Sequence, residues 1–118
     1  MYTLTGRERI IVAEESAIVG FTVLYCYSNT ESMSHVGGVG TFILPSVRVK
    51  GAGTLLNQAL VAAARKLGYE KLIVEVRKQN KIGLRLYEKC GFSRIGELKN
   101  QIKIGNRYDT MVLMKKLI

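Results

Sequence analysis

The chain has 118 residues, 47% of them hydrophobic, and a formal net charge of +9. This length predicts a single domain over residues 1–118 with one hydrophobic core, and it excludes two cores of comparable size. No run approaches the roughly 18 apolar residues of a membrane-spanning helix, and residues 1–10 lack the apolar stretch of a secretory signal, so we expect a cytoplasmic protein.

Residues 9–27 predict a β-hairpin, because two runs of β-branched and aromatic residues flank a polar break at residues 14–16. Residues 35–45 predict a third strand, whose glycines allow another backbone or a ligand to approach closely. From Thr54 the apolar residues follow the period of an amphipathic helix, which ends before Gly68. We therefore expect three strands followed by a helix in the first half of the chain.

Residues 71–76, KLIVEV, predict a strand that is buried on both faces of a parallel sheet. Asn80 can cap a second helix that runs to Cys90, and two further strands flank the turn at residues 105–106. The strand–helix–strand unit over residues 35–76 should cross over right-handed and make its two strands parallel neighbours or near-neighbours. The whole order predicts an α/β fold of the α+β type, with this central β-α-β unit and two main helices.

The cysteines and the histidine do not suggest a metal site. Cys26 and Cys90 lack the spacing of metal ligands, and His35 is the single histidine, so we expect no bound metal. Because disulfides are rare in the cytoplasm, both cysteines are predicted to be free thiols, with a disulfide between them as the alternative.

The charge is distributed unevenly along the chain. Residues 41–118 carry sixteen Lys or Arg against five Asp or Glu. Such an asymmetry is expected for a protein that binds a nucleic acid or a phosphorylated cofactor, and a solvated lysine-rich surface is the alternative. No RNA-binding aromatic pattern and no helix-turn-helix accompany the charge, so a nucleic-acid partner is disfavoured.

The segment VRVKGAG, residues 47–53, joins the predicted third strand to the first helix. A glycine-rich turn that enters a helix directs free backbone N–H groups, and the positive end of the helix dipole, at an anion. The segment lies beyond the carboxyl end of a strand, where ligands of such sheets gather. It matches neither a nucleoside-triphosphate loop nor a dinucleotide fingerprint, which leaves the pattern R-x-x-G-x-G, and an ordinary tight turn is the alternative.

A second motif lies in residues 74–92, VEVRKQNKIGLRLYEKCGF. Asn80, the pair Leu86-Tyr87 and the pair Gly91-Phe92, following the R-x-x-G-x-G turn, resemble the GNAT superfamily of N-acetyltransferases. Within it, the Glu-Val-Arg segment is similar to the ribosomal-protein N-terminal acetyltransferases. The resemblance covers nearly the whole chain and implies a mixed, mostly antiparallel sheet. Members usually have a strand and two helices ahead of the first hairpin, and this chain begins after them.

The resemblance implies an acetyl-CoA-dependent N-acetyltransferase, in which a primary amine attacks the thioester directly. The Glu-Val-Arg segment favours a protein or peptide α-amine as the acceptor over a small amine. The backbone of residues 49–54 is expected to bind the pyrophosphate of acetyl-CoA, the strand backbone at residues 42–44 to pair with the pantetheine arm, and Asn80 to hydrogen-bond the cofactor. The implied cofactor-binding residues are Phe42, Ile43, Leu44, Arg48, Val49, Lys50, Gly51, Ala52, Gly53, Thr54, Asn80 and Tyr87.

Two catalytic residues are expected. An alkylammonium of pKa about 10 must lose a proton before it attacks, and Glu75, a lone carboxylate that is costly to bury in an apolar strand, is the predicted base. An ion pair between Glu75 and Arg77 or Lys71 is the alternative. Tyr87 resembles the general acid that protonates the departing thiolate of CoA, and simple packing of its ring is the alternative.

A different function with the same fold is a non-catalytic module that binds CoA or another protein. A homodimer is also expected, because without the N-terminal elements of the family a sheet edge or acceptor groove is left to cover. No membrane partner is expected.

Overall fold

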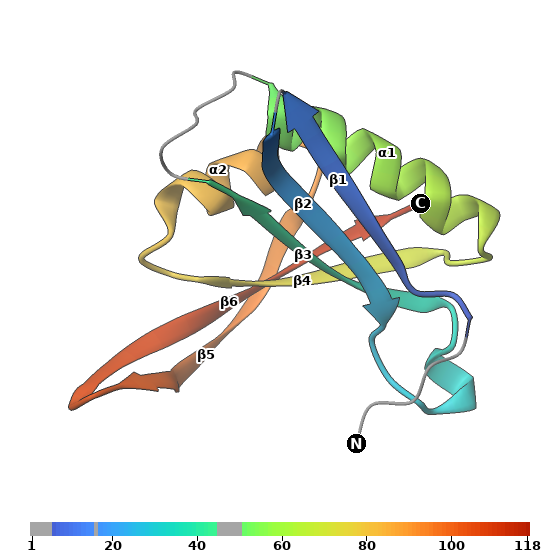
Figure 1. The fold of residues 1–118 in the computed structure, drawn as a ribbon. Coiled ribbons are helices and arrows are strands. Elements are labelled where there is room, and N and C mark those ends of the chain that lie inside the picture. The colour runs from blue at the N-terminus through green and yellow to red at the C-terminus, as the bar shows by residue number, and fades with distance from the viewer. Residues whose placement is uncertain (1–5, 16, 45–50) are drawn as a thin grey trace.

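The computed structural model describes residues 6–15, 17–44 and 51–118 (Figure 1). The order of its strands and helices is the predicted one. The elements are β1 (Arg9–Glu15), β2 (Ala17–Cys26), the 3₁₀ turn η1 (Glu31–Met33), β3 (Val36–Ile43), α1 (Ala52–Lys66), β4 (Lys71–Arg77), α2 (Lys81–Lys89), β5 (Ser93–Ile104) and β6 (Arg107–Leu117).

The strands form one six-stranded sheet in the order β1-β2-β3-β4-β6-β5. Among the described strands, only β3 and β4 pair in parallel, and the other neighbours are antiparallel. Helix α1 connects the two parallel strands, as the β-α-β prediction requires. The prediction of a mixed, mostly antiparallel sheet with two main helices is therefore confirmed.

Both helices cover the same face of the sheet, which Figure 1 shows above β3 and β4. Leu60 of α1 and Leu84 of α2 pack in one core with Val74 and Val76 of β4. The alternation of a strand places the intervening Glu75 on the opposite face. This opposite face is exposed beyond Val74, so the prediction that β4 is buried on both faces holds only for its first residues.

The turns and thiols follow the sequence predictions. The Asn80 Oδ1 atom accepts a hydrogen bond from the Gly83 N–H at 3.0 Å and so caps α2. Neither Cys26 nor Cys90 forms a disulfide, and the Cys26 Sγ atom lies 3.1 Å from the Tyr69 hydroxyl. Within the described part of the chain, no helix has both the length and the apolar character that crossing a membrane requires.

Candidate active site

The two parallel strands separate at the centre of the sheet. Their pairing begins with Val36 opposite Lys71 and ends with Val39 opposite Val74. Strand β3 nevertheless continues to Ile43 and β4 to Arg77. Among the described residues, the last part of β3 therefore has a strand partner on its β2 side only. Its other edge offers backbone hydrogen-bonding groups to an extended molecule.

A cavity of about 280 Å³ lies in the opening between the separated strands and α2. It is lined by Thr41, Phe42, Ile43, Asn80, Ile82, Gly83, Leu86 and Tyr87. Four residues that the sequence singled out, Phe42, Ile43, Asn80 and Tyr87, thus come together from β3 and α2. Leu44 is not among the lining residues, and its backbone N–H donates to the Val19 carbonyl at 2.9 Å. The structure therefore brings these four predicted residues together at one cavity and does not bring Leu44 to it.

Asn80 combines the two roles that the sequence left open. Its side chain caps α2, and the same residue lines the cavity. Gly83, one turn into the helix, leaves room for this arrangement, because an added Cβ atom would lie 2.6 Å from the Asn80 Nδ2 atom, which would have to shift. The glycine therefore makes room for the asparagine side chain at the cavity wall.

Tyr87 enters the opening from the helix-covered face. Its side chain is 4% exposed, and its ring meets Phe92 edge-on with centroids 5.3 Å apart. Burial raises the pKa of the Tyr87 phenol above its ordinary value of 10.0, although hydrogen bonds with Thr41 act in the opposite direction. The Thr41 hydroxyl also lies 3.0 Å from that of Thr22. Tyr87 thus keeps its proton near neutral pH, as a proton donor must.

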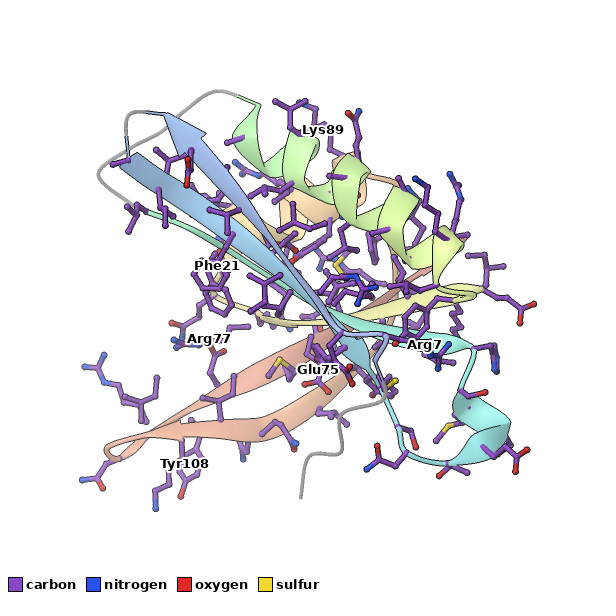
Figure 2. All side chains as sticks on the ribbon, turned by 45° about the vertical axis from the view of Figure 1, so that its right-hand side comes forward. Arg7, Phe21, Glu75, Arg77, Lys89 and Tyr108 are labelled. Atoms are coloured by element: carbon purple, nitrogen blue, oxygen red, sulfur yellow. The ribbon has the colours of Figure 1, made fainter. Side chains whose placement is uncertain are left out.

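Glu75 lies at the same opening but on the other face of the sheet. It directly follows Val74, the last residue of β4 that pairs with β3. Figure 2 shows Glu75 and Arg77 on the side of the sheet away from α1. The expected burial of Glu75 is wrong, because its side chain is exposed. The alternative pairing with Arg77 is also wrong, since the Arg77 Nε atom binds the Asp109 Oδ2 atom at 2.8 Å.

Helix α1 begins in the predicted glycine turn. Gly51 precedes it with a left-handed φ of 88°, and the Leu55 N–H donates to the Gly51 carbonyl at 3.0 Å. Among the described residues, no side chain caps this end, where the first backbone N–H groups lack helical partners. Ala52 is buried and Thr54 half-buried in this first turn. The predicted residues Arg48, Val49 and Lys50 lie outside the described residues.

Gly53 has a packing role that the sequence reasoning missed. An added Cβ atom would lie 2.9 Å from both Cδ atoms of Leu86 and 3.2 Å from the Cδ1 atom of Ile43. Gly53 is itself buried. It therefore allows the start of α1 to approach α2 and β3 closely, which places the helix start beside the cavity of Tyr87.

A second cavity, of about 510 Å³, runs along α1 from its first turn toward its end. It is lined by Thr54, Asn57, Gln58, Val61, Arg65, Lys89, Cys90, Gly91 and Lys116. Asn57 is 3% exposed, and its Nδ2 atom is buried without a hydrogen-bond partner among the described residues. The sequence reasoning missed this cavity, although an asparagine inside the apolar stripe of a helix was the available signal. Its walls carry cations and an unsatisfied donor, which suit an anionic ligand.

Comparisons with known proteins agree with this geometry. A model of the acetyltransferase (GNAT) family matches residues 2–92. The chain is 34% identical over 122 residues to "Putative phosphinothricin acetyltransferase YwnH" of Bacillus subtilis (strain 168), covering 96% of this chain and 71% of that protein. The chain spans 28–71% of the length of the curated relatives that it matches.

Solved structures share the fold. A ribosomal-protein-alanine N-acetyltransferase from Brucella melitensis superimposes with a TM-score of 0.86 at 24% identity, covering 92% of this chain and 68% of that one. A phosphinothricin acetyltransferase from Sinorhizobium meliloti, crystallised with acetyl-CoA, superimposes with a TM-score of 0.88 at 21% identity, covering 97% of this chain and 63% of that one.

Proposed function

The chain belongs to the acetyltransferase (GNAT) family, and from this premise we propose that residues 1–118 act as an acetyl-CoA-dependent N-acetyltransferase domain. The acetyl group passes to a primary amine, and a protein or peptide N-terminus is among the candidate acceptors. The observation that carries the proposal is the separation of β3 and β4 beyond Val39 and Val74, with Asn80 and Tyr87 lining the cavity behind it.

The pantetheine arm of acetyl-CoA is proposed to enter this opening. The arm contains amide groups, and the β4-facing edge of β3 at Phe42 and Ile43 offers backbone partners that no described strand uses. Asn80 lines the opposite wall of the cavity and can hydrogen-bond the same arm. An extended arm in this position brings the thioester between Tyr87 and Glu75.

The diphosphate is proposed to bind at the start of α1. Backbone N–H groups that follow Gly51 have no helical partners, and the helix dipole favours negative charge there. Arg48 and Lys50 remain predicted contributors of positive charge.

The 3′-phosphoadenosine end of CoA is proposed to occupy the cavity along α1. Thr54, in the first turn of α1, lines this cavity, so it begins beside the proposed diphosphate site. Arg65 and Lys89 supply positive charge, and the buried Asn57 Nδ2 atom supplies a donor that lacks a partner in the described residues. A phosphate suits such a cavity, because it carries negative charge and several acceptor oxygens.

The chemistry follows from the two faces of the sheet. Glu75 accepts a proton from the acceptor ammonium on the exposed face, directly or through a water molecule. The amine nitrogen then forms a bond with the thioester carbonyl carbon, and the carbon–sulfur bond breaks. Tyr87 donates its proton to the departing thiolate from the helix-covered face. The nitrogen loses its second proton to form the neutral amide, and the Tyr87 phenolate regains a proton through solvent. The position of Tyr87 in the cavity wall supports this assignment, and its phenol, whose pKa burial raises, carries a proton near neutral pH.

Calorimetry with CoA and dephospho-CoA tests the binding geometry. Lys89→Gln should weaken CoA about tenfold, and it should leave the affinity for dephospho-CoA, which lacks the 3′-phosphate, nearly unchanged. Lys66→Gln is the control, because Lys66 at the end of α1 is exposed, as Lys89 at the end of α2 is, but does not line this cavity. Equal affinity of the unmodified protein for the two ligands would remove the 3′-phosphate from this cavity.

A thiol-release assay tests the reaction itself. Acetyl-CoA is mixed with peptides, free amino acids and polyamines, and free CoA is measured together with the mass of the acetylated product. Release that depends on the acceptor supports an acetyltransferase. Tight acetyl-CoA binding without release for any acceptor would instead support the non-catalytic module.

A further inference from the structure

A third cavity, of about 200 Å³, lies where the end of β4 meets the tip of the β5–β6 hairpin. It is lined by Arg77, Gln79, Ile104, Arg107, Tyr108 and Asp109. The donor site proposed above uses none of these residues. We infer, resting on the proposed function, that this cavity binds a carboxylate of the acceptor. The acceptor is then an amine that also carries a carboxylate, either a free amino acid or an acidic peptide, and not a polyamine.

The one carboxylate of this cavity is already satisfied. The Asp109 Oδ2 atom accepts a hydrogen bond from the Arg77 Nε atom at 2.8 Å, and its Oδ1 atom accepts from the Thr110 N–H at 2.7 Å. The Asp109 side chain is 7% exposed, against 44% for Arg77. Asp109 therefore orients the Arg77 guanidinium and is not available to bind an acceptor ammonium, whereas part of that guanidinium still faces solvent.

Arg107 gives the cavity an excess of positive charge. Its side chain is exposed, and within the described part of the chain no carboxylate forms an ion pair with it. The hairpin as a whole, residues 93–117, carries six Lys or Arg against two acidic residues. This field attracts an anion and repels a polycation. A guanidinium also matches the two oxygens of a carboxylate with parallel hydrogen bonds.

The position of the cavity suits an acceptor site. Arg77 and Glu75 are two residues apart on β4, so their side chains share one face of the sheet, with Cα atoms roughly 7 Å apart. Figure 2 shows both on the side away from α1, with Tyr108 on the hairpin beyond them. Gln79 lines this cavity, and the next residue, Asn80, lines the cavity proposed for the thioester arm. An acceptor whose carboxylate lies beside Arg77 in this cavity can therefore extend its amine toward Glu75.

Paired acceptors that differ only in the carboxylate test the inference. L-leucine is compared with L-leucinamide, and alanyl-glutamate amide with alanyl-glutamine amide, while spermidine represents the polyamines. Binding is measured by calorimetry with CoA present, and kcat/KM by thiol release. We expect at least one carboxylate to bind tenfold or more tightly than its amide partner. A preference within the leucine pair assigns the α-carboxylate, and one within the dipeptide pair assigns a peptide side chain.

Variants locate the effect. Arg107→Gln should reduce the carboxylate-to-amide preference about tenfold, and Arg107→Lys, which keeps the charge, should recover part of it. Lys99→Gln is the matched control, because Lys99 is an exposed cation of β5 that does not line the cavity. Acetyl-CoA affinity, measured for each variant, reports that the fold is intact. If Arg107→Gln does not fold, the same comparison is made with Arg107→Lys alone.

The inference is overturned if each amide binds as well as its carboxylate partner, if spermidine is the preferred acceptor, or if the Arg107 and Lys99 variants reduce the preference equally. Failure of the proposed function has a different signature, because acetyl-CoA then neither binds nor releases thiol with any acceptor. Carboxylate binding that depends on Arg107 would still support the cavity assignment in that case.

Discussion

Replacement of Tyr87 by phenylalanine separates the chemical role of the hydroxyl from the packing role of the ring. The ring is buried and contacts Phe92 edge-on at 5.3 Å, and phenylalanine can keep both the burial and this contact. The hydroxyl loses its hydrogen bonds with Thr41. The Thr41 hydroxyl retains a partner, because the Thr22 hydroxyl lies 3.0 Å away.

Tyr87→Phe is expected to change the stability, the turnover and the acetyl-CoA affinity by different amounts. The hydrogen bonds with the side chain and the backbone of Thr41 are removed while the Thr41 hydroxyl keeps a partner, so the free energy of unfolding should fall by about 1–3 kcal/mol. General acid catalysis contributes about 10²–10⁴-fold in rate, so kcat should fall at least a hundredfold. The affinity for acetyl-CoA should change little, because the proposed anionic contacts lie at α1.

Single-turnover thiol release, urea unfolding and calorimetry measure the three quantities on one variant. Tyr27→Phe is the control, since Tyr27 is a partly exposed tyrosine that does not line the cavity. A Tyr87→Phe enzyme with full activity would refute the assignment of the acid. A loss of activity that is matched by a large loss of stability would assign Tyr87 a packing role only.

Four further predictions follow from the structure. The unmodified protein and Tyr87→Phe should differ in free energy of unfolding by an amount that is constant below about pH 10 and declines above it. The reason is that the raised phenol pKa favours the protonated form in the folded state. A decline already at pH 8 would contradict this. Gly53→Ala should lower the free energy of unfolding by about 1–3 kcal/mol through crowding of Leu86. The control Gly96→Ala should change the free energy of unfolding by less than about 0.5 kcal/mol, because the added Cβ atom meets nothing within 4 Å. Burial raises the pKa of the Cys90 thiol, so iodoacetamide should label Cys90 slowly at pH 7, as measured by peptide mass mapping. CoA should slow the labelling further, because Cys90 lines the cavity along α1. Labelling that CoA does not change would speak against a ligand in this cavity. The expected homodimer should appear in light scattering at micromolar concentration. Ile10→Lys should weaken the dimer if the edge strand β1, where Ile10 is 71% exposed, forms the interface. A monomer for both the unmodified protein and the variant would reject the dimer.

Much of the fold was predictable because its signals are local. The cap at Asn80 and the strand–turn–strand pattern around residues 105–106 depend on neighbours a few residues apart, and both are present as expected. The R-x-x-G-x-G turn and the Leu-Tyr and Gly-Phe pairs identified the family for the same reason, since each motif is contiguous. The role of Gly53 was only half predicted, because its contact with Leu86 joins two helices that the sequence cannot place against each other.

The sequence by itself determined the order of elements, the family motifs and the residue types of the candidate site. Only the tertiary structure decided that β3 and β4 separate after Val74, that Glu75 is exposed, and that Arg77 binds Asp109. It also decided that Asn57 is buried beside cations from α1, α2 and β6. The physical reason is the range of the interactions: periodicity and capping act between neighbours along the chain, whereas burial, charge pairing and the end of a strand ladder depend on residues tens of positions away.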